Sequence, residues 1–236
     1  FCDGYGLDKD VCDSLIDMYA SCGGLEEAFK MFNGLPVRNI FSWTAIILGC
    51  VLHNNGLLAL ELFEKMQEQE IRADKPIYLC VARACAISGS IMEGRLIHDQ
   101  ILRSGLDDLD LMIKNMLVHM YAKCGSIEDA QRVFDKLMKR NVVTWSSLMS
   151  GYVQLGREQE ALQLFKQMQE EGLVADDVTY VCLLKGDLIE RLHIDSTIRS
   201  TFIFSKGENE ILAHQLKHIK CTNLITHKNG KHHFIN

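Results

Sequence analysis

The stretch MYAKCGSIEDA, residues 120–130, decides the fold, because a near-copy of it, MYASCGGLEEA, occupies residues 18–28. The copies lie 102 residues apart, and the same offset aligns residues 13–74 with residues 115–176 without a gap. In that alignment 24 of 62 positions are identical. Self-similarity over so long a window indicates a repeated architecture.

The composition is that of a helical protein with a substantial core. The chain has 236 residues, of which 47% are hydrophobic and 24% charged, with 17 Gly and only 2 Pro. No apolar run approaches the roughly 18 residues of a membrane span, so we expect no membrane partner. Because the sequence starts at Phe1 rather than at an initiator methionine, we expect more chain before it. The absence of a targeting signal therefore does not indicate the compartment.

Inside the repeated phrase the apolar residues have a helical period. Leu117, Met120, Tyr121 and Cys124 fall at i, i+3, i+4 and i+7, as do their counterparts 102 residues earlier. This spacing predicts that Cys22 and Cys124 are buried packing residues rather than ligands or nucleophiles. The nine cysteines form no CxxC pair, which favours reduced thiols over disulfides or structural zinc. We predict no metal and no cofactor.

The centre of the phrase predicts a turn between two helices. Gly125 can adopt the left-handed conformation that ends a helix, and Ser126 can cap the next one, with Asp129 completing a capping box. The second helix should turn one apolar face inward. Its inward residues are predicted to be Ile127, Ala130, Phe134 and Leu137, and in the later repeat Ala161, Leu164, Phe165 and Met168.

Helical hairpins of this size cannot bury their apolar faces alone, so they stack into solenoids. The predicted fold class is therefore all-α, an α-solenoid of antiparallel helical hairpins wound as a right-handed superhelix, with Trp43 and Trp145 in equivalent places. The predicted hairpins are residues 9–39, 40–74, 75–110, 111–141 and 142–176, flanked by fragments at 1–8 and 177–185.

The sequences of these hairpins resemble those of the pentatricopeptide repeat proteins of plant organelles, in particular the subclass with alternating P, L and S repeats. DSLIDMYASCGGLEEAFKMF and NMLVHMYAKCGSIEDAQRVF resemble S repeats, and ACAISGSIMEGRLIHDQILRSG resembles an L repeat. NIFSWTAIILGC and NVVTWSSLMSGY, with ALELFEKMQEQEIRAD and ALQLFKQMQEEGLVAD, resemble P repeats. The order is S–P–L–S–P, with part of an L repeat at 1–8 and the start of another at 177–185.

The resemblance implies sequence-specific binding of single-stranded RNA, about one base per repeat. The family reads each base with the residue after the aromatic position of the first helix and with the last residue of the hairpin. The pairs carried over are Thr44 with Asp74, Ser146 with Asp176, Asn115 with Asn141, Asp13 with Asn39, and Leu79 with Asp110. A hydroxyl with a carboxylate suits guanine, whose Watson–Crick edge donates N–H groups, and the two asparagines resemble a pyrimidine reader. An apolar Leu cannot read a base edge, and Asp13 stands where the family usually has Asn.

Three further residues precede these readers on the same helices and could wedge between bases: Phe41, Met112 and Val143. Charge opposes RNA binding, because residues 1–185 carry 18 basic against 26 acidic side chains, a net −8. Affinity for nucleic acid rests heavily on Lys and Arg meeting phosphates. A five-repeat array should therefore bind weakly unless more repeats, a locally basic groove or a partner helps.

Residues 186–236 continue no repeat and are predicted to be a divergent tail, poorly ordered or holding one short helix. Editing members of the family often end in a deaminase-like domain, which needs H-x-E and C-x-x-C for its zinc. Neither motif occurs here, and no nucleophile–base pair or phosphate loop appears, so we predict no catalytic residues and no enzyme.

Two functions follow from these observations. The first is an RNA-binding module that guides RNA modification, namely C-to-U editing by a deaminase or other editing factor, in the mitochondrion or chloroplast as the resemblance implies. The second is a helical scaffold for protein partners, which any solenoid can be.

Overall fold

The computed structural model describes residues 9–106 and 111–185, and every regular element in those ranges is an α-helix. The chain divides into two compact units, residues 1–186 and 187–236, and all described residues belong to the first. The predictions for residues 1–8, for Asp110 and for the tail at 186–236 lie outside the described residues.

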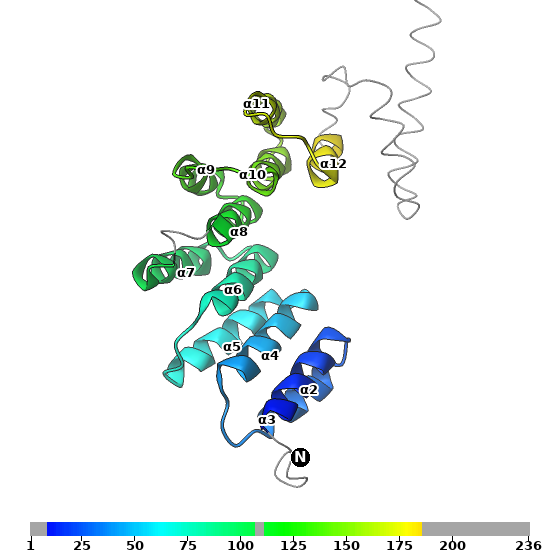
Figure 1. Cartoon of the computed structure of the whole chain (residues 1–236), viewed down its shortest axis with the longest axis vertical. Helices are drawn as coiled ribbons and strands as arrows, with labels where there is room; N and C mark the ends of the chain where they lie inside the picture. Colours follow the sequence, from blue (N-terminus) through cyan, green and yellow to red (C-terminus); the bar gives the residue numbers. More distant parts are fainter. Residues whose placement is uncertain (1–8, 107–110, 186–236) are drawn as a thin grey trace, which may run out of the picture. The chain divides into compact units, whose positions relative to one another are not determined.

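Eleven helices follow one another in the described part of the chain (Figure 1). They are α2 (Lys9–Ser21), α3 (Leu25–Asn33), α4 (Ile40–Leu52), α5 (Gly56–Glu68), α6 (Lys75–Ser88), α7 (Ile91–Ser104), α8 (Leu111–Lys123), α9 (Ile127–Asp135), α10 (Val142–Gln154), α11 (Glu158–Glu170) and α12 (Asp177–Lys185).

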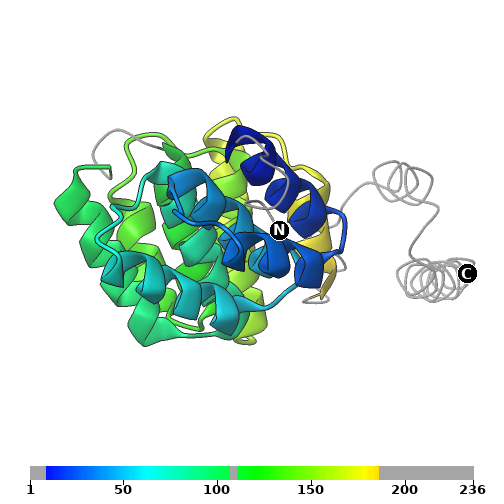
Figure 2. The same cartoon turned by 90° about the horizontal axis from the view of Figure 1, so that it is seen from below.

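The helices pair as hairpins that stack in sequence order. The first helices of successive hairpins form one continuous row, in which α2, α4, α6, α8, α10 and α12 each pack on the next. The second helices, such as α3 and α9, pack beside their own first helix and against the first helix that follows. Figure 2 shows the same hairpins from below. The predicted all-α solenoid is confirmed for the described residues.

Two glycines allow the first helices to approach closely. A Cβ on Gly49 of α4 would lie 2.6 Å from the Cβ of Ala20 on α2, and a Cβ on Gly151 of α10 would lie 2.8 Å from that of Ala122 on α8. Such separations are shorter than van der Waals contact, so only glycine fits at both positions without a backbone shift. Both copies therefore set the spacing of consecutive first helices in the same way.

The two tryptophans occupy equivalent buried places, as predicted. Trp43 and Trp145 are each 2% exposed. Each packs edge-on against a phenylalanine of the preceding second helix, Phe32 and Phe134, with ring centroids 4.8 Å apart in both pairs. Edge-to-face pairs at this distance stabilise beyond the area that they bury.

The prediction that both repeated cysteines are buried is wrong for Cys22, which is exposed, and Cys124 is partly exposed. Each lies one residue beyond the last residue of its helix, Ser21 or Lys123, so the helical spacing no longer directs it into the core. Burial, and next the nearby charge of Glu93, raises the pKa of the Cys124 thiol to about 11, so at neutral pH it is protonated.

The predicted turn is confirmed in its backbone and wrong in its cap. Gly125 has φ +77°, the left-handed conformation expected at a helix end. Ser126, however, makes no side-chain bond to the backbone, because its Oγ donates to Asp129 Oδ2 at 2.7 Å instead. The residues predicted to face inward are all buried, namely Ile127, Ala130 and Phe134 on α9, Leu137 just after it, and Ala161, Leu164, Phe165 and Met168 on α11.

Candidate nucleic-acid interface

In the four predicted hairpins whose last residue the structure describes, that residue is the N-cap of the next first helix. Asn39 Oδ1 accepts from the backbone N–H groups of Phe41 and Ser42 at 2.8 and 2.9 Å, and Asp74 Oδ1 accepts from that of Ile77 at 3.1 Å. Asn and Asp are strong N-cap residues because their oxygens satisfy the free N–H groups of the first turn.

Asn141 and Asp176 repeat this arrangement. Their Oδ1 atoms accept from the backbone N–H groups of Thr144 and Thr179 at 3.0 and 2.8 Å. Capping therefore fixes four predicted readers, the two Asn and the two Asp. It leaves the second carboxylate oxygen of Asp74 and Asp176 without a hydrogen-bond partner among the described residues, as an available acceptor.

In the predicted hairpins 9–39 and 111–141 the predicted partners are hydrogen-bonded to each other. Asn39 Nδ2 donates to Asp13 Oδ2 at 2.7 Å, and Asn115 Nδ2 donates to Asn141 Oδ1 at 3.3 Å. Thr144 Oγ1 also donates to Asn115 Oδ1. The structure thus brings together the first-helix residue and the following N-cap, as the pairing requires.

In the predicted hairpins 40–74 and 142–176 no hydrogen bond joins the predicted partners. Thr44 Oγ1 donates to the carbonyl of Ile40 in its own helix at 2.6 Å, and Ser146 Oγ donates to that of Val143 at 3.2 Å. Thr44 is partly exposed, whereas Ser146 is buried at 4% exposure. Both hydroxyls have acceptors within their own helices, so a base would have to compete for the hydroxyl proton.

The predicted wedging side chains all project into solvent. Phe41 is 71% exposed, and Met112 and Val143 are more than half exposed. Each lies three residues before a predicted reader on the same helix, and Phe41 and Val143 also lie two residues after the N-caps Asn39 and Asn141.

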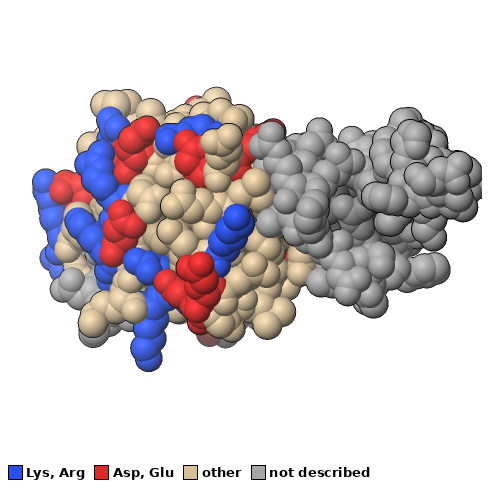
Figure 3. All heavy atoms as spheres, turned by 90° about the horizontal axis from the view of Figure 1, so that it is seen from above, with Lys and Arg blue, Asp and Glu red and all other residues tan. Residues whose placement is uncertain are grey.

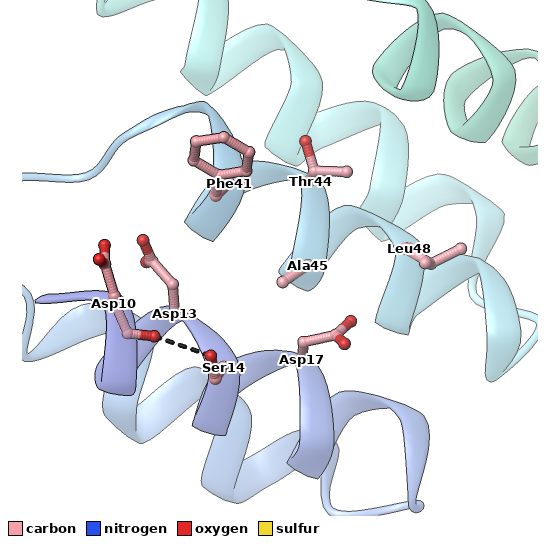
Figure 4. Close-up of a pocket in the computed structure, with 8 residues that line it drawn as sticks. All are labelled: Asp10, Asp13, Ser14, Asp17, Phe41, Thr44, Ala45 and Leu48. Carbon is pink, nitrogen blue, oxygen red and sulfur yellow. Dashed lines mark hydrogen bonds between the residues drawn. The ribbon is translucent and has the colours of Figure 1, made fainter.

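Two grooves lie between first helices at equivalent places. The first groove, between α2 and α4, has a volume of about 430 Å³ and is lined by Asp10, Asp13, Ser14, Asp17, Phe41, Thr44, Ala45 and Leu48 (Figure 4). Figure 4 shows the three aspartates along α2 and, on α4 across from them, Phe41, Thr44, Ala45 and Leu48. Ser14 Oγ is turned back to its own helix, donating to the carbonyl of Asp10 at 2.8 Å.

The second groove, formed by α6, α8 and α10, has a volume of about 660 Å³. It is lined by Arg83, Leu111, Met112, Asn115, Met116, His119, Asn141, Val143 and Ser147. Six of these, at 112, 115, 116, 119, 143 and 147, are the counterparts at +102 of residues in the first groove. The second groove therefore gathers two predicted readers and two predicted wedging residues.

The lining charges of the two grooves have opposite sign. The first groove contains the carboxylates of Asp10, Asp13 and Asp17 and no lining cation. The second contains Arg83 and no lining carboxylate. Burial, and next the charges of Lys123 and Arg83, lowers the pKa of His119 in the second groove, so its ring is neutral at neutral pH.

Sequence reasoning missed Arg83, His119, Asp10 and Asp17. Helical spacing could have found two of them, because Asp17 and His119 lie four residues after the predicted readers Asp13 and Asn115 on the same helix face. The view in Figure 3 shows basic and acidic side chains interspersed around a wide uncharged area, rather than one basic surface.

Two further findings concern the described residues as a whole. No group of three or more His, Cys, Asp or Glu side chains there is arranged to hold a metal ion. None of the helices described is both long and apolar enough to cross a bilayer.

Family models match most of the repeated region. A model described as PPR repeat matches residues 11–40, 41–71 and 113–142, and one described as PPR repeat family matches residues 140–186.

Curated relatives from Arabidopsis thaliana are similar over most of the chain. Pentatricopeptide repeat-containing protein At5g16860 is 36% identical over 86% of this chain and 25% of its own length. Pentatricopeptide repeat-containing protein CRR2, chloroplastic, is 38% identical over 77% of this chain and 28% of its own length. The chain thus spans about a quarter of the length of these relatives.

Solved structures share the fold at low sequence identity. The pentatricopeptide repeat protein PPR10 from maize matches with TM-score 0.58 and 18% identity, over 89% of this chain and 34% of that one. The PPR domain of Arabidopsis thaliana protein-only RNase P 1, solved in complex with tRNA, matches with TM-score 0.58 and 12% identity, over 78% of this chain and 97% of that one.

Proposed function

The chain belongs to the pentatricopeptide repeat family, and from that premise we propose that residues 9–176 form a sequence-specific module for binding single-stranded RNA. The repeats run in the order S–P–L–S–P, at residues 9–39, 40–74, 75–110, 111–141 and 142–176, with the start of an L repeat at 177–185. Each repeat takes about one base.

The second groove is the observation that carries this proposal. Asn115 and Asn141 lie hydrogen-bonded at its wall, so their amides are held in place by contacts with the protein before any RNA arrives. Met112 and Val143 supply exposed apolar surface on either side for a base to rest against. Arg83 adds a fixed positive charge for a phosphate. Base-edge donors, a stacking surface and a cation at one place are what an unpaired nucleotide needs.

The capping geometry favours guanine opposite two of the repeats. Asp74 and Asp176 each use one oxygen for the helix cap and keep the other as an acceptor. Guanine donates from N1–H and from its 2-amino group, whereas adenine presents an acceptor at N1. Read from 5′ to 3′ along the repeats, the preferred sequence is any base, guanine, any base, pyrimidine, guanine.

The biological setting that we propose is organellar RNA processing, with the module guiding C-to-U editing. The relative CRR2 is named as chloroplastic, which supports a mitochondrial or chloroplast location for this chain. The repeats bind and do not catalyse, so the modification would be done by a deaminase or another editing factor that the bound repeats position.

A second function, a scaffold for protein partners, is favoured by the first groove. Three aspartates in one groove repel phosphates and suit a basic protein segment better than an RNA strand. The two functions make different predictions for binding at the two grooves.

The discriminating experiment is a binding titration of the full chain with a short single-stranded RNA of the preferred sequence, at low and at physiological salt. We expect Arg83→Gln to weaken binding and to flatten its salt dependence. Arg72→Gln is the matched control, because Arg72 is exposed and lines neither groove. RNA affinity that is absent, or equally affected by the two substitutions, would leave the scaffold as the better reading.

A further inference from the structure

Each pair of successive hairpins in the described residues meets where the second helix of one hairpin packs on the first helix of the next. At four of the five junctions two aromatic rings meet there. The pairs are Phe32 with Trp43, Phe63 with Tyr78, Phe134 with Trp145, and Phe165 with Tyr180, with ring centroids 4.8, 6.4, 4.8 and 6.4 Å apart. Apolar rings therefore fill these junctions.

The junction between α7 and α8 has a polar ring pair instead, His98 of α7 with Tyr121 of α8, at a centroid separation of 5.6 Å. His98 stands where the other second helices have phenylalanine, four residues after Gly94 just as Phe134 stands four residues after Ala130. On the first helix, Lys114 stands directly before the reader Asn115, in the place that tryptophan or tyrosine holds at the other junctions. A histidine and a lysine have replaced the aromatic pair.

A pocket of about 650 Å³ opens at this junction, among α7, α8 and α9. We call it the junction pocket, and its walls include Arg95, His98, Leu102, Lys114, Tyr121 and Lys136. Its volume falls within the range of sites for drug-sized ligands and is far larger than one inorganic ion requires. Its wall is shaped by a hydrogen bond of 2.9 Å between His98 Nδ1 and the Tyr121 hydroxyl.

The junction pocket has an excess of positive charge. Asp129 is already paired, since it accepts from Arg95 at 2.8 Å, from Arg132 at 2.7 Å and from Ser126 at 2.7 Å. Burial alone would raise the pKa of Asp129, but these hydrogen bonds and charges outweigh it and lower the pKa, so the carboxylate is ionised.

The other acid at this pocket, Asp99, is paired with Arg103 at 2.7 Å. Lys114 and Lys136, by contrast, have no carboxylate or hydrogen-bond partner among residues 9–106 and 111–185. Two ammonium groups therefore line a concave site whose acids are already engaged, in a chain of net charge −6.

We propose that the junction pocket binds a compact organic phosphate of nucleotide size, with the phosphate on Lys114 and Lys136 and the organic part against Leu102 and the ring edges of His98 and Tyr121. A phosphate dianion is the ligand that two unpaired ammonium groups recognise best. The pocket lies among α7, α8 and α9 and shares no lining residue with either groove, so this site is separate from the proposed base readers.

The test is a calorimetric titration of the full chain with adenosine 5′-monophosphate, adenosine and inorganic phosphate. We expect the nucleotide to bind more tightly than the nucleoside or the free ion. The double variant Lys114→Met/Lys136→Met should weaken nucleotide binding by about tenfold or more, which corresponds to 1.4 kcal/mol. The matched control is Lys139→Met, because Lys139 is exposed near the same hairpin and does not line the pocket.

A second variant tests the geometry independently of charge removal. His98→Phe/Lys114→Trp restores the aromatic pair of the other junctions and should abolish nucleotide binding while keeping the helical circular dichroism spectrum. Nucleotide binding that survives either double variant, or that is no tighter than binding of adenosine or of inorganic phosphate, would overturn the proposal. The Lys136→Met variant should bind the preferred RNA as tightly as the parent chain does. A loss of RNA affinity alongside the loss of nucleotide affinity would make the pocket part of the RNA-binding surface and would overturn the proposal of a separate site.

Discussion

The first groove and the second groove occupy equivalent places 102 residues apart, and they are built on helices with the same glycine contact and the same buried tryptophan. Their linings nevertheless differ in sign. Where α2 carries Asp10, Asp13 and Asp17, α8 carries Met112, Asn115 and His119. The spacing of the first helices is set by buried residues, so the residues that line the grooves can change charge without changing the stack.

The two copies also differ in how much of them is covered. Met18 and Met120 are the same residue at the same place in the repeated phrase, but Met18 is 45% exposed and Met120 is completely buried. The helix α8 packs against α6 and α7, whereas in the described residues no helix precedes α2. Burial in a solenoid is thus a property of neighbouring hairpins as much as of a hairpin's own sequence.

The largest effect should come from the core that the copies share. Trp43→Ala and Trp145→Ala should each destabilise their region by about 3–5 kcal/mol, because each removes a fully buried indole and its phenylalanine contact. Urea denaturation followed by circular dichroism measures both. Phe41→Ala is the control, since an exposed ring on the same helix as Trp43 should have little effect. If one of the two tryptophan substitutions leaves the free energy of unfolding unchanged, the two copies are not equivalent in their packing.

The methionines provide the next contrast. Met120→Ala should cost about 2–5 kcal/mol through a buried cavity, whereas Met18→Ala should change stability by less than about 0.5 kcal/mol in this chain. The measurement is the same denaturation series. Equal losses would mean that Met18 is covered by a part of the chain outside the described residues.

Helical periodicity predicted the hairpins, the inward residues of α9 and α11 and the two tryptophans, because each of these depends on residues within two or three adjacent helices. It failed for Cys22 and for the Ser126 cap, for two physical reasons. The helix α2 ends at Ser21, so Cys22 no longer follows the helical spacing that would direct it into the core. The Ser126 hydroxyl donates its hydrogen bond to the carboxylate of Asp129, three residues on, and makes no bond to the backbone of the first turn.

The grooves were only partly predictable. The predicted readers were chosen by their position within the repeat, and the structure joins Asn115 to Asn141 and Asp13 to Asn39 by hydrogen bonds. Arg83 and the opposite lining charges of the two grooves were not predicted, because Arg83 comes from a neighbouring hairpin whose distance in space no local pattern gives.

The substitution Asp74→Asn tests the proposed recognition of guanine by Asp74. Asparagine caps a helix as well as aspartate, so the substitution should leave α6 intact and change only the group offered to the base. An amide can donate to adenine N1, so preference should move from guanine towards adenine by about 1–3 kcal/mol, visible as roughly tenfold or more. Binding titrations with RNAs that differ at that one base measure it.

Asp177→Asn is the control for Asp74→Asn, because Asp177 carries the same charge in the first turn of α12 and is not a predicted reader. Equal affinity for guanine and adenine in both the parent chain and Asp74→Asn would remove base reading at this repeat.

Exchanging the lining charges should give a smaller effect. Asp17→His makes the first groove more like the second, and His119→Asp does the reverse. We expect RNA affinity to rise in the first variant and to fall in the second by about 1 kcal/mol each, roughly fivefold, with both changes shrinking at high salt. If both variants bind RNA as the parent does, the strand does not pass through these grooves.

The smallest effect should be a pH dependence specific to the second groove. In the folded chain, burial and then the charges of Lys123 and Arg83 lower the pKa of His119, so the unfolded chain takes up this proton at a higher pH than the folded chain does. Folding therefore gains stability from His119 above its ordinary pKa of about 6.5, and this gain is lost as the pH falls through the lowered folded value. We expect His119→Gln to lose less stability than the parent chain on acidification through that window. Titration of the ring by proton NMR checks the cause directly, and a His119 pKa at or above the ordinary value would contradict both the desolvation argument and the expected acid sensitivity.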